Sequence, residues 1–302
     1  MRRAAAVVIN RNTRDLLIEC LESLADQDIA GGISVWVVDN GSSDGSPAEV
    51  LRHFSEANLI WNDRNAGYAK ACNQGIKNSI EPYIIIMNSD TVLSPGTAST
   101  LVAFLEQNPE VGVAAPRILN PDGSIQYSVR DFPGLKTAFM HAFAGLIRSD
   151  NPYSASYKKT AWDHDSKAEV DWVSGACMAL RRKAVEEVGG FDEGYFMYVE
   201  DVDLCWRMRE AGWRVVYLPG GDVLHHVGMS SRAATTRMLF HHHRSMLRFH
   251  RKTYRGPARR SVNALVALGV IARFALIISL NALNRLKGAL GGPKRTIAPG
   301  DQ

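Results

Sequence analysis

Short apolar runs alternate with helix-like segments through the first part of the chain. Runs 4–9, 33–38 and 84–87 each have the length of a buried strand, and shorter runs lie at 59–61 and 111–115. Between them, apolar residues recur three and four positions apart, which is the period of an α-helix. Strands and helices that alternate in this way build a mainly parallel sheet covered by helices. The pattern therefore predicts an α/β fold.

Polar residues stand at the carboxyl ends of these strands. The second strand runs into the polar turn 39–46, and Asn65 and Gly67 precede a helix that follows the short third strand. Open α/β sheets bind ligands at this edge, and a glycine before a helix lets backbone N–H groups approach a phosphate. These segments predict a nucleotide site, although a plain turn has the same composition.

Asp90 follows the strand 84–87 in the sequence Asn88-Ser89-Asp90. A carboxylate there offers the hard oxygen atoms that Mg²⁺ or Mn²⁺ prefers, and a cation bound to it would bridge a diphosphate. An Asp in this position is also common in ordinary turns. His225, near the end of a later strand, is either a structural histidine or a metal ligand.

Three carboxylates fall within residues 200–203, directly before a helix-compatible run. Carboxylates this close repel one another, so a folded chain keeps them where charge is useful or well solvated. Asp201 is predicted to be the N-cap of the helix, where the dipole keeps it ionised. The buried side would hold Leu204, Cys205 and Met208. Asp201 could then act as a general base in a cleft; the alternative is an ordinary acidic helix start.

Charge is distributed unevenly along the chain. Residues 223–300 contain 14 Lys or Arg and no Asp or Glu, whereas residues 1–222 contain 21 basic and 30 acidic residues. A basic C-terminal region of this kind is directed at an anionic partner, either nucleic acid or a membrane surface.

Within this basic region, residues 264–283 are almost wholly apolar and long enough to span a bilayer. Arg273 would then lie near the middle of the span, at a cost of roughly 2.5–3.5 kcal/mol. The polar residues around it share one side of a helix: Asn263, Arg273, Asn281, Asn284 and Arg285. This pattern favours an amphipathic helix, residues 262–286, that lies in the membrane interface. The alternative is a helix buried against the rest of the protein.

The middle of the chain has a different composition. Residues 120–165 are rich in Pro, Gly, Ser, Asp and Tyr around an apolar island at 137–147, which predicts a long, partly mobile segment over the sheet. A strand is expected again at 170–180. Three consecutive histidines, 241–243, fan around a predicted helix at 235–253 and so indicate a solvated helix face. Four widely spaced cysteines indicate buried, reduced thiols in a cytoplasmic protein.

Taken in order, these motifs resemble those of the family 2 glycosyltransferases of the GT-A fold, in particular the bacterial rhamnosyltransferase-like branch. The resemblance covers roughly residues 4–255. The matching segments are 10–13, 37–46, 65–68, 87–90, 189–192, 200–207 and 212–214, with His225 and Ser230. It implies a Rossmann-like, nucleotide-binding sheet in a GT-A domain of residues 1–233. Its halves, 1–118 and 119–233, would serve the nucleotide sugar and the acceptor, and a basic helical region would follow at 234–302.

The resemblance implies a role for each matching residue. Asp90 would bind the Mg²⁺ or Mn²⁺ ion, with His225 as a further ligand. Asp201 would be the base, and Glu200 would belong to the catalytic residues. Asn88 stands where many relatives have the first Asp of a D-x-D element, which removes one negative charge from the metal site. The substrates would be bound by Asn10, Asn12, Asp39, Asn40, Asn65, Gly67, Asn88, Trp206 and Arg207.

The implied reaction is an inverting sugar transfer in bacterial cell-surface polysaccharide biosynthesis. The donor would be a dTDP- or UDP-sugar, with dTDP-rhamnose preferred, and the acceptor a lipid-linked glycan or polysaccharide. The basic region would attach the protein peripherally to anionic lipid on the cytoplasmic face of the inner membrane, and no nucleic acid is expected as a partner. Two alternatives are a nucleotidyltransferase, which should have a Gly-rich, Arg-containing loop after the first strand, and a non-catalytic nucleotide-sugar binder.

Overall fold

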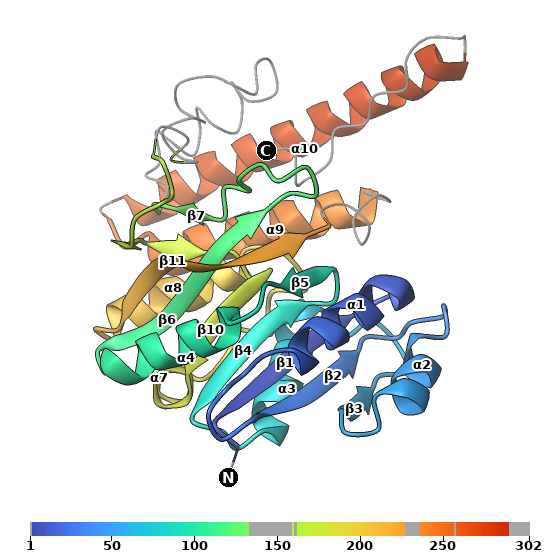
Figure 1. The fold of residues 1–302 in the computed structure, drawn as a ribbon. Coiled ribbons are helices and arrows are strands. Elements are labelled where there is room, and N and C mark those ends of the chain that lie inside the picture. Colours follow the sequence, from blue (N-terminus) through green and yellow to red (C-terminus); the bar gives the residue numbers. More distant parts are fainter. Residues whose placement is uncertain (1, 133–158, 160–161, 227–235, 257, 290–302) are drawn as a thin grey trace.

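A computed structural model describes residues 2–132, 159, 162–226, 236–256 and 258–289, with side chains up to Asn284. A central sheet lies between helices (Figure 1). The N-terminal half contributes β1 (Ala4–Asn10), α1 (Arg14–Ala25), β2 (Ile33–Asp39), α2 (Ser46–His53), β3 (Asn58–Trp61), α3 (Tyr68–Asn78), β4 (Tyr83–Asn88), β5 (Thr91–Leu93), α4 (Thr97–Gln107) and β6 (Val111–Leu119). The C-terminal half adds β7 (Val129–Arg130), β8 (Ala168–Glu169), β9 (Trp172–Val173), β10 (Cys177–Arg181), α7 (Arg182–Val188), α8 (Glu200–Glu210), β11 (Arg214–His225), α9 (Thr236–Thr253) and α10 (Arg259–Ala289).

The strands of the main sheet follow the order β3-β2-β1-β4-β10-β6-β11-β5, with β8 beside β11. The pairs β3–β2, β2–β1, β1–β4 and β6–β11 are parallel, so the predicted mainly parallel sheet is confirmed. Strand β10 runs antiparallel between β4 and β6. Its direction brings the preceding residues 174–176 to the carboxyl end of β4, where the Asn88 N–H donates to the Ala176 carbonyl at 2.9 Å.

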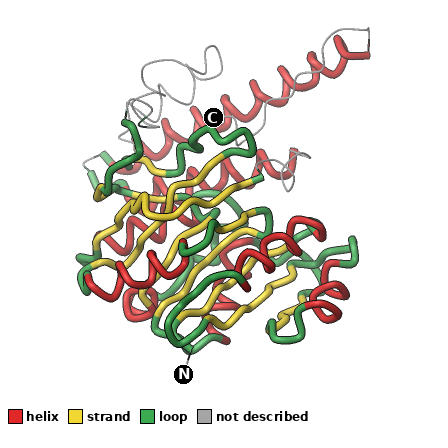
Figure 2. The backbone as a smooth tube through the Cα atoms, viewed as in Figure 1, coloured by secondary structure: helices red, strands yellow, loops and turns green. Residues whose placement is uncertain are grey.

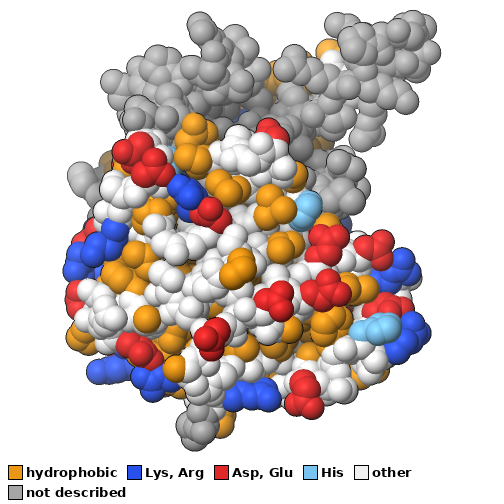
Figure 3. Space-filling view, viewed as in Figure 1, with side chains coloured by type: hydrophobic (Ala, Val, Ile, Leu, Met, Phe, Trp, Pro, Cys, Tyr) orange, Lys and Arg blue, Asp and Glu red, His pale blue; other side chains and the backbone are white. Residues whose placement is uncertain are grey.

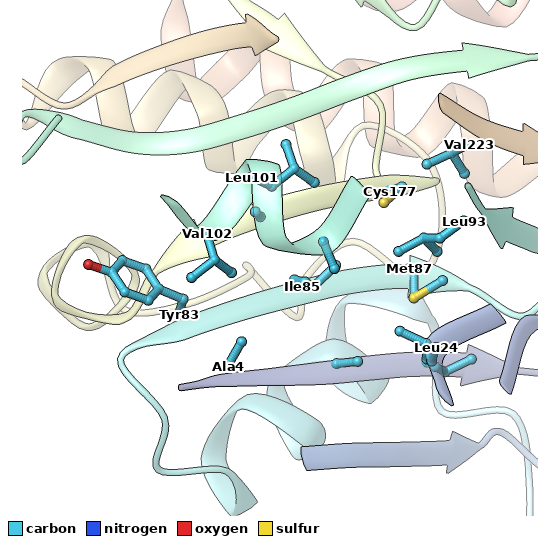
Figure 4. Packing of buried hydrophobic residues seen from close by; sticks show 14 of the residues in the cluster. Ala4, Leu24, Tyr83, Ile85, Met87, Leu93, Leu101, Val102, Cys177 and Val223 are labelled. Carbon is cyan, nitrogen blue, oxygen red and sulfur yellow. The ribbon is translucent and has the colours of Figure 1, made fainter. Parts of the chain in front are cut away.

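Two hydrophobic clusters cover the two faces of the sheet. Helices α1, α2 and α4 pack on one face, and α3, α7 and α8 pack on the other. Figure 4 shows the first cluster, with Ile85 and Met87 of β4 pointing into it. Ile84 and Ile86 belong to the second cluster, because successive side chains of a strand point to opposite faces. Burial on both faces explains why run 84–87 is continuously apolar.

The structure differs from the sequence-based prediction in its irregular parts. The strand expected at 170–180 is two strands: β9 pairs with β7 in a small second sheet, and β10 joins the main sheet. Strand β11 continues to His225 across a register irregularity between Tyr217 and Asp222. The apolar island at 137–147 and Ser230 lie outside the described residues. All four cysteines are buried and unpaired, as expected.

The C-terminal helices lie along one side of the molecule, with α9 between α10 and the rest of the described chain (Figures 1 and 2). Both predicted helices exist, at Thr236–Thr253 and Arg259–Ala289. Residues Arg259–Asn284 are long and apolar enough to cross a membrane, with a mean hydropathy of 2.1, and only 11% of the most apolar window is buried. The alternative of a helix buried in the protein therefore does not hold. The division of the chain at residue 233 stays a prediction.

The interpretation of the histidine triplet as a solvated face is wrong for His243. This residue is 4% exposed, and its Nε2 atom lies 3.0 Å from an Nη atom of Arg273 on α10. The polar side of α10 faces α9 at this point, which the local sequence of α9 does not reveal. Elsewhere on the surface, acidic side chains gather over the region of α1 (Figure 3), where Asp15, Glu19 and Glu22 are exposed.

Candidate active site

A cleft of about 700 Å³ opens at the carboxyl ends of β1, β2 and β4. Loop 174–176, the segment 196–201, His225 and the start of α9 complete its lining. The sequence-predicted residues in the lining are Asn10, Asn12, Asn40, Asn65, Asn88, Glu200, Asp201 and His225. Elements from both halves of the chain therefore meet at the edge of the sheet where α/β folds bind ligands.

Asp39 lies beneath the cleft and is completely buried. Its carboxylate accepts hydrogen bonds from Asn10 Nδ2 at 2.7 Å and from the Ser42 N–H at 2.9 Å. Buried carboxylates are retained where donors satisfy them. In this structure Asp39 orients Asn10 and the turn after β2.

Asn40 joins that turn to the segment before α3. Its Oδ1 atom accepts the Ala66 N–H at 2.8 Å, and its Nδ2 atom donates to Asn65 Oδ1 at 3.0 Å. Gly67 follows with φ of 94°, and a Cβ atom at this position would lie 2.7 Å from the Phe196 carbonyl oxygen. Glycine is therefore required both by its backbone conformation and by the close approach of the segment before α8.

Asp90 and His225 meet beside the cleft. Their Oδ1 and Nε2 atoms are 3.2 Å apart, and the Asp90 side chain is 3% exposed. His225 Nδ1 lies 2.8 Å from Gln126 Oε1. Because an amide oxygen only accepts, Nδ1 carries a proton and directs Nε2 toward Asp90. Metal-binding histidines are held in this way by a partner on the other ring nitrogen.

The residues present fit a divalent cation shared with a substrate. Among the described residues, no group of three or more His, Cys, Asp or Glu side chains could hold a metal ion by itself. Two protein ligands leave the other coordination positions to diphosphate oxygens and water, which is how Mg²⁺ is usually bound at phosphate sites.

A turn with an uncommon backbone conformation precedes α8, the helix that carries Glu200 and Asp201. Tyr198 and Val199 both have positive φ angles, 66° and 71°, an uncommon conformation that is especially unfavourable for a β-branched residue. The helix begins at Glu200, so the prediction of Asp201 as its N-cap is wrong: Asp201 is its second residue. The Asp201 carboxylate accepts the Gly175 N–H at 2.9 Å and the Val202 N–H at 2.8 Å.

Burial separates the protonation states of the two neighbouring carboxyls. Burial raises the pKa of Asp201, while the Gly175 and Val202 N–H groups and the charge of Arg130 act in the opposite direction. Burial and the charge of Asp201 together raise the pKa of Glu200 well above 4.5. The Glu200 Oε2 atom has no hydrogen-bond partner among the described residues, and only the backbone N–H of Glu200 itself acts against the rise in its pKa. Asp201, which accepts the Gly175 and Val202 N–H groups, therefore ionises more readily than Glu200.

Asp203 has a different role from its two neighbours. Its buried carboxylate binds Arg207 Nε at 2.7 Å and Lys252 Nζ of α9 at 2.7 Å. The Tyr195 hydroxyl donates to it at 3.1 Å. These contacts place Arg207 outside the cleft. Trp206 also lies outside it, with its ring 5.4 Å from the Arg255 guanidinium carbon.

Several lining residues were not selected from the sequence. The Tyr68 hydroxyl donates to the Gly175 carbonyl at 2.7 Å and so links α3 to the loop before β10. Phe196 and Arg237 reach the cleft from segments without a recognisable nucleotide-binding motif. Tyr68 stands directly after Gly67 in a matching segment, which is the one signal that could have indicated it.

Comparison with known proteins identifies the family to which this chain belongs. The model of glycosyl transferase family 2 matches residues 5–189. The chain belongs to this family. It is 35% identical over 251 residues to an N-acetylglucosaminyl-diphospho-decaprenol L-rhamnosyltransferase of Mycobacterium tuberculosis, covering 78% of this chain and 81% of the relative. It is 29% identical to rhamnosyltransferase WbbL of Escherichia coli over 56% of this chain and 61% of that protein.

Solved structures support the same fold. A mannosyltransferase from Pyrobaculum calidifontis, in complex with GDP-Man and Mn²⁺, aligns with a TM-score of 0.56 at 19% identity, over 96% of this chain and 81% of that one. GalNAc-T7 with UDP, GalNAc and Mn²⁺ aligns with a TM-score of 0.58 at 13% identity, over 81% of this chain and 47% of that one. The chain has the GT-A fold of these glycosyltransferases, as expected.

Proposed function

We propose that this glycosyltransferase moves a sugar from a nucleotide donor to a lipid-linked acceptor with inversion at the anomeric carbon. The observation that carries the proposal is the position of Asp201: its carboxylate lines the same cleft as the asparagines at the strand ends and His225. Of the two adjacent carboxyls, Asp201 ionises more readily and so is suited to act as the base, and the reaction then needs no nucleophile from the protein.

Different residues of the chain bind the nucleotide and remove the proton. The polar ends of β1 and β2 bind the nucleotide, with Asp39 holding Asn10 in place. Asp201 takes the proton from the acceptor hydroxyl as that oxygen attacks the anomeric carbon. The nucleoside diphosphate leaves from the opposite side of the sugar, so the configuration inverts. The hydrogen bonds from the Gly175 and Val202 N–H groups fix the orientation of the Asp201 carboxylate.

Asp90 and His225 would hold a Mg²⁺ or Mn²⁺ ion, whose charge would stabilise the departing diphosphate. The Mn²⁺ in the two solved relatives supports this assignment.

The donor and acceptor are proposed from the relatives. Similarity to two rhamnosyltransferases favours rhamnose, with dTDP-rhamnose as its activated form. The name of the Mycobacterium tuberculosis relative describes an acceptor sugar joined to decaprenol through a diphosphate. A lipid-linked glycan of cell-surface polysaccharide biosynthesis is therefore the proposed acceptor class.

Helix α10 supports attachment to the cytoplasmic face of a bacterial membrane. Leu265, Leu268 and Ile271 are more than half exposed, whereas Arg273 and Asn281 are buried on the side toward the protein. A helix that hides its polar groups against α9 presents an apolar face to its surroundings, which suits a helix embedded in one leaflet. Basic residues on α9 and α10 would strengthen binding to anionic lipid.

The test is a panel of nucleotide sugars, measured by thermal stabilisation and by transfer to a lipid-linked acceptor with Mg²⁺ or Mn²⁺. Stabilisation and transfer with dTDP-rhamnose are expected. Stabilisation by a UDP-sugar and not by dTDP-rhamnose would indicate that the donor is a UDP-sugar. Binding without any transfer or donor hydrolysis would favour a non-catalytic binder, and formation of a sugar nucleotide from a sugar phosphate would favour a nucleotidyltransferase.

A further inference from the structure

Arg237, the second residue of α9, lines the cleft together with Met238. Its guanidinium carbon lies 5.6 Å from the centre of the Phe196 ring. His241, one turn further along α9, stacks on the same ring at 4.3 Å. The Phe196 carbonyl accepts the Tyr68 N–H at 2.8 Å. Arg237 is therefore held beside the cleft by a ring that is itself fixed to the start of α3.

Among the described residues, no carboxylate forms an ion pair with Arg237. The Arg237 side chain is exposed. A guanidinium group presents paired N–H donors that match two oxygens of a phosphate. At the mouth of a cleft for phosphorylated substrates, such a group is suited to bind a diphosphate.

Arg237 lines the same cleft as Asp201 and stands on the helix that contacts α10, and this placement indicates which diphosphate it binds. Phe240 follows within one turn of α9, and its ring centre lies 6.4 Å from that of Phe274 on α10. Beyond that contact, α10 exposes the apolar face described above. The first turns of α9 therefore connect the cleft that Asp201 lines with the helix that carries the apolar face. A sugar joined to a lipid through a diphosphate carries its anion between the lipid and the acceptor hydroxyl, where a cation on α9 is suited to meet it.

We infer that Arg237 binds the diphosphate of the lipid-linked acceptor and thereby positions the acceptor hydroxyl at Asp201. This inference rests on the proposed function and adds a recognised group on the acceptor to it. The donor diphosphate is the competing source of the same chemistry, and the experiment separates the two.

The experiment measures binding to full-length protein, without donor, of two ligands held in nanodiscs of neutral lipid. One is N-acetylglucosamine joined to a polyprenol through a diphosphate; the other is the same sugar joined to the same polyprenol through an uncharged linkage. Arg237→Gln should weaken binding of the first ligand about tenfold to a hundredfold, because charge-assisted hydrogen bonds are lost. The loss should disappear with the uncharged ligand. Arg237→Lys should recover part of the affinity.

Arg244→Gln is the matched control, because it removes the same charge from an exposed position of α9 outside the cleft lining. Equal losses in the two glutamine variants would indicate general attraction only and overturn the inference. Unchanged lipid binding together with weaker nucleoside diphosphate binding would assign Arg237 to the donor and also overturn it. Because no transfer is needed for this readout, a failure of catalysis would count against the proposed function alone.

Discussion

Lys252 of α9 forms an ion pair with Asp203 of α8, with Nζ and Oδ1 2.7 Å apart. The Asp203 side chain is completely buried, and Arg207 binds its other oxygen at 2.7 Å. On α9, Arg248 and Lys252 also bind Asp192. The Ser245 hydroxyl of the same helix donates to the Met197 carbonyl at 3.0 Å. Helix α9 therefore packs along the segment that carries the turn Tyr198–Val199 and the carboxyls of Glu200 and Asp201.

Removal of the Asp203 charge should destabilise the protein rather than abolish catalysis directly. Asp203→Asn leaves Arg207 partly buried without its anion and leaves Lys252 with Asp192 alone, and breaking a buried ion pair in this way costs about 3–5 kcal/mol. Urea denaturation measures the loss. Glu210→Gln, which removes an exposed carboxylate from the same helix, is the control and should cost about 1 kcal/mol or less. Equal small losses would contradict the structural role of Asp203.

Asp201 and Glu200 should respond oppositely to amide substitution. Asp201→Asn removes the base and should reduce turnover by about two to four orders of magnitude, with folding and donor binding nearly intact. Glu200→Gln resembles the neutral carboxyl already present and should retain turnover within about tenfold. Steady-state kinetics with saturating donor measure both. Normal turnover in Asp201→Asn would remove this residue from the mechanism, and inactivity of Glu200→Gln would shift the role of base to Glu200.

The pH dependence of kcat/KM should show that the base is a buried carboxyl. Because burial raises the pKa of Asp201 above 3.8, kcat/KM should fall on the acid side at a higher pH than an exposed Asp would produce. Glu200→Gln should leave this acid limb in place. An acid limb of kcat/KM with a pKa near the ordinary value of 3.8 would contradict the assignment of Asp201 as a buried base. An acid limb whose pKa changes in Glu200→Gln would contradict it as well.

Stability should respond to Glu200 in the same pH range. The folded-state pKa of Glu200 lies above its ordinary value of 4.5, so the folded protein holds this proton more tightly than the unfolded chain. Stability therefore decreases as pH rises from about 4.5 toward the raised folded pKa. Glu200→Gln removes this penalty, and the difference in Tm between variant and wild type should become more positive over that window. A constant difference would show that Glu200 has no raised pKa.

Metal dependence should be visible in binding as well as in activity. EDTA is expected to abolish transfer, and Mn²⁺ together with a nucleoside diphosphate should raise the Tm of the wild type more than either ligand alone. Asp90→Ala should lose this joint effect, because one of two protein ligands is removed. Full activity after exhaustive chelation would contradict the proposal.

Membrane attachment should depend on the exposed face of α10. Leu268→Glu places a charge on this face, at a residue 64% exposed, and should weaken pelleting with anionic liposomes at least tenfold, because apolar contact is lost and a charge enters the interface. Leu51→Glu on α2 is the matched control, at 63% exposure. Similar behaviour of the two variants, or a wild type that does not pellet at low salt, would contradict the proposed attachment.

The sequence by itself determined the elements and the ends of the strands. Continuous apolar runs such as 84–87 are required for strands buried on both faces, and the polar residues after them can lie only at the carboxyl edge of a parallel sheet. Local periodicity likewise located α9 and α10. The strand ends thus placed Asn40 and Asn65 at one edge of the sheet, whereas Asn10 and Asp201 joined the predicted site through the resemblance to family 2 glycosyltransferases.

Only the tertiary structure decided which of these groups share a cleft and how readily each carboxyl ionises there. The antiparallel course of β10 brings the Gly175 N–H to Asp201, and the packing of α9 brings Lys252 to Asp203 and Arg237 to the cleft rim. These contacts join residues far apart in the chain, so no local pattern records them. Burial, which raises the pKa of Glu200 and Asp201 and hides His243, is likewise set by what packs against a residue rather than by its neighbours in sequence.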